Sequence, residues 1–149
     1  MPVFAVLVAN LEAQTFVARL VSINVMMQLG KPIMVVDDEP DITYIINKVF
    51  QLNGIITDSF NDAEEALSHF KRGMYGLLIL DIGMPKMNGF ELYREIRKID
   101  AEVKICFFSA YETYNGYTDS TAIRCIIKKP ILMADLVKHV RLEVTPLIA

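Results

Sequence analysis

From Lys31 onward, short aliphatic runs alternate with longer stretches in which apolar residues recur at helical spacing. Unbroken aliphatic runs are typical of strands that are buried on both faces of a parallel sheet. Helical spacing of apolar residues instead indicates helices with one buried face. The pattern predicts strands at Ile33–Val36, Ile55–Thr57, Leu77–Leu80, Lys104–Phe108 and Arg124–Ile127. It predicts helices over 40–52, 61–71, 89–98 and 133–144, and a further short helix within 111–121.

Turn and capping residues fall where these helices should begin and end. Pro40 suits a first helical turn, Asn61 is the expected cap of the second helix, and Asn88-Gly89 opens the third. Strands and helices that alternate in this way predict one α/β domain with a doubly wound parallel sheet. A flavodoxin-like sheet of five strands has the order 2-1-3-4-5, with helices on both faces.

Three acids follow the first and third predicted strands. Asp37 and Asp38 come directly after the first strand, and Asp81 comes directly after the third. The order 2-1-3-4-5 makes these strands neighbours, so the three carboxylates should converge at one edge of the sheet. Carboxylates this close repel one another unless a cation lies among them. A cluster of hard oxygen ligands with room for water suits Mg²⁺.

Two further groups follow the fourth and fifth strands and should lie opposite the acids. Ser109 supplies a hydroxyl and Lys129 an ammonium group. Together with a metal-bound carboxylate, these groups could clamp a transferring phosphoryl group, because phosphoryl transfer is catalysed mainly by positioning and charge neutralisation. The obvious nucleophile is the Asp81 carboxylate, which would form an aspartyl-phosphate.

Net charge and cysteine content narrow the class of protein. The net charge is −3 and no run of basic residues occurs in the 149 residues, which argues against a nucleic-acid surface. Cys106 and Cys125 are widely spaced in apolar runs, so we interpret them as buried free thiols. We expect a cytoplasmic protein.

The first thirty residues do not follow the regular pattern. The apolar run near the start is interrupted too often for a membrane span, and no basic residue precedes it as a signal peptide would require. The stretch 11–27 could form an amphipathic helix. Alternatively, Met26 or Met27 is the natural start and the residues before it are a gene-model extension. We therefore divide the chain into an N-terminal extension of uncertain status, 1–30, and a domain over 31–149.

Four motifs in order and in register carry a family resemblance: VVDDEP, LLILDIGMPKMNG, FFSA and KKP. They closely resemble the response-regulator receiver domain of two-component signalling, over Lys31 to about Val144. The resemblance implies that Asp81 is the phosphoacceptor and that Ser109 and Lys129 contact the phosphoryl group. It implies Mg²⁺ ligation by Asp38, Asp81 and the Gly83 carbonyl, with Asp37 binding directly or through water. It also implies a cis peptide bond between Lys129 and Pro130.

The resemblance further implies a phosphorylation-dependent signalling switch of the stand-alone type. Its partners would be a sensor histidine kinase or phosphotransfer protein that supplies the phosphoryl group, and a downstream effector protein. Such a domain is not an enzyme in the ordinary sense, because it catalyses only its own phosphorylation and dephosphorylation. Little sequence follows the last predicted helix, so output would come from binding another protein.

Two positions depart from the family pattern. Ile126 stands where the family usually has a Tyr or Phe that couples to phosphorylation. Gly83 stands where many members carry a side chain that affects water access to the phosphoryl group. One alternative is therefore a degenerate receiver that acts only as a docking module. Another is an aspartyl-phosphate phosphatase, although Gly83 replaces the general acid that haloacid-dehalogenase-type phosphatases carry two residues after the nucleophile.

Overall fold

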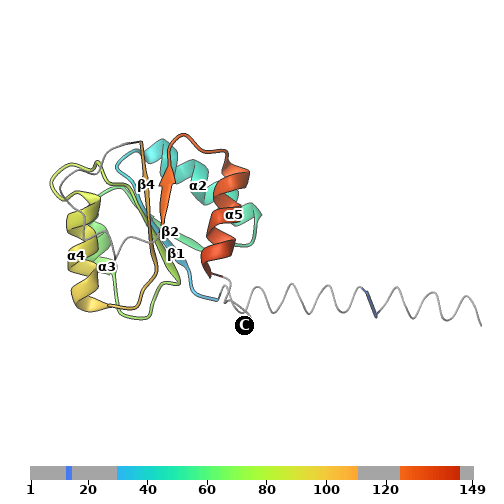
Figure 1. Ribbon diagram of the computed structural model, residues 1–149, viewed down its shortest axis with the longest axis horizontal. Helices are drawn as coiled ribbons and strands as arrows, with labels where there is room; N and C mark the ends of the chain where they lie inside the picture. The colour runs from blue at the N-terminus through green and yellow to red at the C-terminus, as the bar shows by residue number, and fades with distance from the viewer. Residues whose placement is uncertain (1–12, 15–29, 111–124, 145–149) are drawn as a thin grey trace, which may run out of the picture.

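A computed structural model describes residues 13–14, 30–110 and 125–144, which form a parallel sheet flanked by helices (Figure 1). The described part contains five strands and four helices, and the sheet order is β2-β1-β3-β4-β5. All four strand pairs are parallel. The predicted doubly wound fold and strand order are therefore confirmed. The elements are β1 Ile33–Val36, α2 Pro40–Leu52, β2 Thr57–Phe60, α3 Ala63–His69, β3 Leu77–Leu80, α4 Gly89–Ile99, β4 Ile105–Ser109, β5 Ile126–Lys128 and α5 Met133–Val144.

The sheet separates two apolar layers, because successive strand residues point to opposite faces. Helices α3 and α4 cover one face and helices α2 and α5 cover the other (Figure 1). Leu78 and Leu80 of β3 belong to the core under α3 and α4, whereas Leu77 and Ile79 belong to the core under α2 and α5. Every residue of β1, β3 and β4 is buried, which explains why these strands appear in the sequence as continuous aliphatic runs.

Strand β2 lies later in the chain than the sequence predicted. Ile55 is buried just after α2, where its N–H donates to Phe50 O, and pairing with β1 begins only at Thr57. The strand is Thr57–Phe60, not Ile55–Thr57. Because β2 is an edge strand, it is only half buried and does not need a continuous aliphatic run. Apolar content was therefore a poor guide to its position.

Helix α3 is shorter than predicted and has a different cap. Asp62 accepts the Glu65 N–H at its N-terminus, and the helix ends at His69 rather than near residue 71. Asn61 is not the cap, because its side-chain amide donates to Asp37 O and to Thr43 Oγ1. Asn61 therefore stabilises the segment that follows β1 and does not cap α3.

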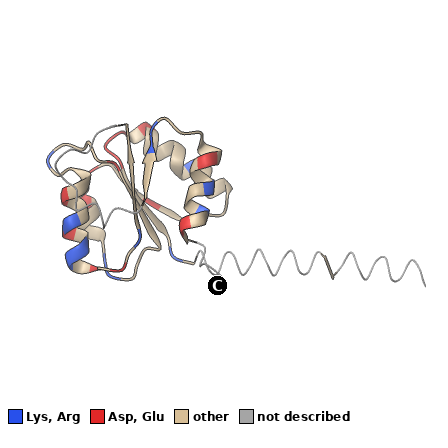
Figure 2. Ribbon diagram, viewed as in Figure 1, with Lys and Arg blue, Asp and Glu red and all other residues tan. Residues whose placement is uncertain are grey.

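Helices α4 and α5 match their predicted starts. Asn88 and Glu91 form a reciprocal capping box at the start of α4, in which each side chain accepts the other residue's N–H. The exposed side of α4 carries both signs of charge, including an ion pair between Lys98 and Glu95 at 2.7 Å (Figure 2). The peptide bond between Lys129 and Pro130 is cis, as predicted.

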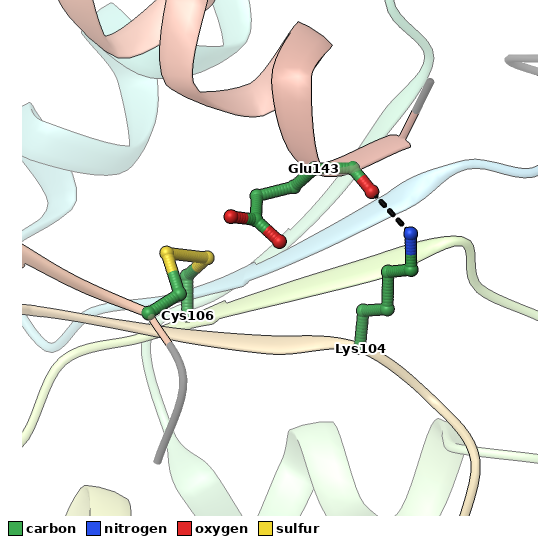
Figure 3. Close-up of a disulfide and its surroundings, with 4 residues drawn as sticks. Lys104, Cys106 and Glu143 are labelled. Carbon is green, nitrogen blue, oxygen red and sulfur yellow. Dashed lines mark hydrogen bonds between the residues drawn. A yellow bond between two sulfur atoms is a disulfide. The ribbon is translucent and has the colours of Figure 1, made fainter. Parts of the chain in front are cut away.

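The two cysteines form a disulfide, so the prediction of free thiols is wrong (Figure 3). Strands β4 and β5 pair with an offset that places Phe107 beside Ile126, and the same offset places Cys106 beside Cys125. Their Cα atoms are 4.6 Å apart. The register of β4 and β5 brings residues 106 and 125 side by side, so their wide separation in the sequence does not prevent a disulfide.

Two further predictions concern residues that lie wholly or mostly outside the described ranges. The short helix within 111–121 lies outside the described residues. Of the amphipathic helix considered over 11–27, the structure describes only residues 13–14, which are helical. None of the described helices is long and apolar enough to cross a membrane.

Candidate functional site

Three carboxylates meet at the ends of two neighbouring strands, as the sequence predicted. Asp37 and Asp38 follow β1, and Asp81 follows β3, whose residues pair with β1 along its length. Carboxylate oxygens of all three lie within 4.8 Å of one another. Asp37 is fully buried and Asp81 is 7% exposed. Backbone pairing fixes the start of each loop, since Asp81 N–H donates to Val36 O and Asp37 N–H donates to Phe60 O.

Lys129 reaches this cluster from the end of β5. Its ammonium lies 2.5 Å from Asp37 Oδ2 and 3.7 Å from Asp81 Oδ1. It also lies over the Phe108 ring, 4.7 Å from the centroid, which adds a cation–π contact. The lysine side chain is 14% exposed, so little water screens these interactions. Lys129 is thus positioned between two acids, closer to Asp37.

One ammonium does not neutralise three acids, and the pKa of Asp81 reflects that imbalance. The pKa of Asp81 is raised to about 6, mainly by burial and then by the negative charge of Asp37, whereas Lys129 acts in the opposite direction. An elevated carboxylate pKa means that the ionised form lacks compensation at this position. A bound cation would supply that compensation, and the three oxygen donors match what Mg²⁺ prefers.

Ser109 and Gly83 lie at the same end of the sheet, whereas Ile126 is the first residue of its strand. Ser109 is the last residue of β4 and is 1% exposed, and its carbonyl accepts the Lys129 N–H. Gly83 lies in the loop after β3, two residues beyond Asp81, and is exposed. Ile126, at the position of the usual aromatic residue, is in β5 and 43% exposed.

The position of the loops at the site depends on further residues that the sequence does not identify as site residues. Gly89 lies so close to this loop that a Cβ atom there would come within 2.3 Å of Asp81 O. The Gly89 N–H also donates to Ile82 O at 2.9 Å. Thr43 and Asn61 form a second support, because Asn61 joins Thr43 Oγ1 to Asp37 O. The only sign of this close packing in the sequence is Asn88-Gly89, which by itself predicts no more than a helix start.

The described residues contain one other group of three potential metal ligands. It consists of Cys106, Cys125 and Glu143, and the two sulfur atoms are joined in a disulfide. Only the cluster of Asp37, Asp38 and Asp81 therefore combines three ionisable oxygen ligands with a nearby lysine, within the described ranges.

The chain is similar to known proteins over most of its length. The model of the response regulator receiver domain matches residues 33–141. The response regulator receiver protein CpdR of Brucella abortus is 30% identical over 112 residues, which cover 74% of this chain and 93% of that protein. The probable transcriptional regulator ycf27 of Guillardia theta is 34% identical over 88 residues. The chain spans only 34% of that longer relative.

Solved structures show the same fold. The response regulator protein TrrA of Thermotoga maritima, crystallised with Mg²⁺ and BeF, is 36% identical with a TM-score of 0.67, covering 76% of this chain and 98% of that one. TrrA in complex with the histidine kinase ThkA gives a TM-score of 0.68 at the same identity, covering 77% of this chain and 99% of that one. With its strand order, its acidic cluster and a family match over most of its length, this chain belongs to the response regulator receiver domains.

Proposed function

We propose that the chain is a signalling switch in which Asp81 accepts a phosphoryl group. The observation that carries this proposal is the placement of the Lys129 ammonium between Asp37 and Asp81, beside three converging carboxylates. In an ion pair with a purely structural role, one lysine ordinarily neutralises one carboxylate. Here, among the described residues, one ammonium lies beside three carboxylates, which is the arrangement expected of a site that binds a cation and a phosphoryl group together.

Asp81 is the proposed nucleophile. One of its carboxylate oxygens attacks the phosphorus of a phosphohistidine on a partner kinase, the P–N bond breaks, and the imidazole leaves. The product is an acyl phosphate on Asp81. Lys129 then has a stronger partner than before, because the phosphoryl oxygens carry more charge than the original carboxylate. We expect its ammonium to shift from Asp37 toward the phosphoryl group, with the Ser109 hydroxyl donating to another phosphoryl oxygen.

Asp37, Asp38, Asp81 and the Gly83 carbonyl would hold Mg²⁺, whose chemistry at this site is to neutralise charge that develops on the phosphoryl oxygens. The donor set supports this assignment because it contains oxygen ligands and no sulfur or imidazole. Asp37 has a further task, since it is the main partner of Lys129. With Mg²⁺ bound, Asp37 would attract the Lys129 ammonium less strongly, and the lysine would be free to contact the phosphoryl group.

The proposed donor is a histidine kinase or a phosphotransfer protein, and the proposed output is binding to an effector protein. The complex of the similar TrrA with the histidine kinase ThkA supports the first assignment. Phosphorylation would shift an equilibrium between two conformations rather than build a new structure. Ile126 is exposed on β5, so a partner surface that includes β5 and α5 would contact an aliphatic side chain in place of a ring.

The test is phosphorylation of the full chain by acetyl phosphate with Mg²⁺, followed by intact mass. We expect a gain of one phosphoryl group that is stable in acid and labile in base. Asp81→Asn should abolish the gain, and Asp38→Asn should raise the Mg²⁺ concentration required by about tenfold or more. Asp41→Asn is the matched control, because Asp41 is an exposed acid in the first turn of α2.

An unchanged mass in wild-type protein would favour the docking module instead. Rapid turnover of varied phosphomonoesters would favour a phosphatase. Equal loss of labelling in Asp41→Asn and Asp81→Asn would indicate a general effect of charge and not a specific nucleophile.

A further inference from the structure

We propose that Cys106 and Cys125 form a site of reversible oxidation, with a low-molecular-weight disulfide of the glutathione class as oxidant, and that the oxidised pair holds β5 on the sheet. The proposal does not depend on phosphoryl transfer at Asp81. It depends on the register of two strands, on the contact between the two cysteines and on the position of β5 at the edge of the sheet.

The two cysteines are direct neighbours across a parallel strand pair. Phe107 pairs with Ile126 and Phe108 with Ile127, so the cysteines one residue earlier on each strand face one another. Their Cα separation of 4.6 Å lies within the range that a disulfide spans without backbone movement. The bond can therefore form or open while the strands stay in register. Both side chains belong to the core between the sheet and helices α2 and α5.

Strand β5 has few other attachments. It is three residues long and lies at the edge of the sheet, and among the described strands it pairs with β4 alone. Ile126 and Lys128 are exposed, leaving Ile127 as its buried side chain. Backbone bonds from Phe107 N–H to Cys125 O and from Lys129 N–H to Ser109 O mark its two ends. A covalent link at Cys125 thus restrains a strand that little else secures, and Lys129 follows this strand directly.

Both cysteines are buried, with residue exposures of 9% for Cys125 and 1% for Cys106, so an oxidant reaches them only when this edge of the sheet opens locally. We expect the less buried Cys125 to react first. The Glu143 carboxylate lies within 4.8 Å of both sulfur atoms. Lys104 Nζ donates to Glu143 O at 2.5 Å, so this end of α5 places polar groups beside the sulfur pair (Figure 3).

The reaction consists of two exchange steps. The Cys125 thiolate attacks one sulfur of the oxidant, the S–S bond of the oxidant breaks, and one thiol leaves with a proton. The Cys106 thiolate then attacks Cys125 Sγ and expels the second thiol. Two electrons pass from the protein to the oxidant, and one disulfide is exchanged for another. Excess thiol reverses both steps.

The experiment uses the full chain in mixtures of reduced and oxidised glutathione, with free thiols alkylated before intact mass is measured. We expect a single transition between a form that takes up two alkyl groups and a form that takes up none. Amide exchange in 126–128 should accelerate about tenfold or more on reduction. The melting temperature should fall by about 10 °C, because the link joins residues with a sequence separation of 19 and so restrains the unfolded chain. A core strand such as β1 should show a smaller change in exchange.

Single variants test the order of the steps. Cys106→Ser should retain one glutathionyl group on Cys125, whereas Cys125→Ser should acquire little at the more buried Cys106. Cys106→Ala/Cys125→Ala is the matched control, and its exchange in 126–128 should not respond to the redox mixture. The proposal is overturned if the wild-type thiols never pair, if they pair only between molecules, or if exchange in 126–128 does not depend on oxidation. Tight binding of Zn²⁺ by the reduced pair and Glu143, with resistance to oxidation, would identify a metal site instead.

Discussion

At the scale of single residues, the position of Lys129 accounts for most of the charge balance of the site. Its ammonium is closer to Asp37 than to Asp81, by 2.5 Å against 3.7 Å. The sequence predicted that Asp37, Asp81 and Lys129 would meet, because each follows a strand of the parallel sheet. It could not predict which acid the lysine contacts, since that depends on side-chain reach and burial. The pKa of Asp81 is raised mainly by burial and then by the charge of Asp37, and the more distant lysine offsets only part of this.

Lys129→Met should destabilise the metal-free protein by about 3 kcal/mol, measured by urea unfolding. The change removes the main partner of a fully buried carboxylate, and an unpaired buried charge is costly. Added Mg²⁺ should restore part of the loss, because the cation neutralises the same acids. Lys98→Met is the control, since its ion pair with Glu95 is exposed and should contribute less than about 1 kcal/mol. Equal losses in the two variants would contradict this account of Lys129.

At the scale of elements, the loop from β3 to α4 determines where Asp81 lies. The start of α4 was predictable, because Asn88 with Glu91 is a capping box whose signal is local in sequence. The cap of α3 was predicted incorrectly. Asn61 and Asp62 are both good capping residues, and only the tertiary bonds of Asn61 to Asp37 O and Thr43 Oγ1 distinguish them. Local signals therefore predicted helix starts except where a neighbouring loop engaged the same side chain.

Gly89→Ala should displace this loop. The added Cβ would lie 2.3 Å from Asp81 O and 2.9 Å from Ile82 Cα, and both are backbone atoms that cannot move without shifting the loop. We expect a loss of about 3 kcal/mol in stability and at least tenfold slower labelling by acetyl phosphate.

Gly76→Ala is the matched glycine control. Its added Cβ would meet Lys31 Cβ at 3.5 Å, an ordinary contact, so stability should change by less than about 1 kcal/mol. If Gly89→Ala labels Asp81 at the wild-type rate, the loop is not positioned as described.

At the scale of the whole molecule, the alternation of apolar runs with helices was sufficient to predict a doubly wound parallel sheet, and the flavodoxin-like order assigned to it is confirmed. The disulfide was not predictable in the same way. Its formation depends on the register of β5 against β4, and the apolar pattern does not determine register to one residue. The edge strands β2 and β5 were also located less accurately than β1 and β3, because an edge strand is not buried on both faces.

A buried acid far from the site links two turns that precede neighbouring strands. Asp100 accepts N–H groups from Gly73, before β3, and from Glu102, before β4. These bonds, with that of Gly73 first, lower the pKa of Asp100 below its ordinary value. A depressed carboxylate pKa contributes stability above the unfolded pKa near 4, and the contribution is lost as pH falls through the folded value.

Asp100→Asn should therefore lower the melting temperature by about 5 °C at pH 7. The difference from wild type should shrink as pH falls below about 4, because the wild-type carboxylate becomes protonated there. Scanning calorimetry between neutral and acidic pH measures both effects. A difference that stays constant over this range would show that the charge of Asp100 contributes nothing.

The central claim is that Asp81 is the residue that carries the phosphoryl group. The most direct measurement is borohydride reduction of the phosphorylated chain, which converts an aspartyl-phosphate to homoserine, followed by peptide sequencing by mass spectrometry. We predict conversion at Asp81 that requires Mg²⁺ and phosphodonor, with no conversion at Asp37 or Asp38. Conversion at another acid, or none in protein whose mass shows phosphorylation, would contradict the account.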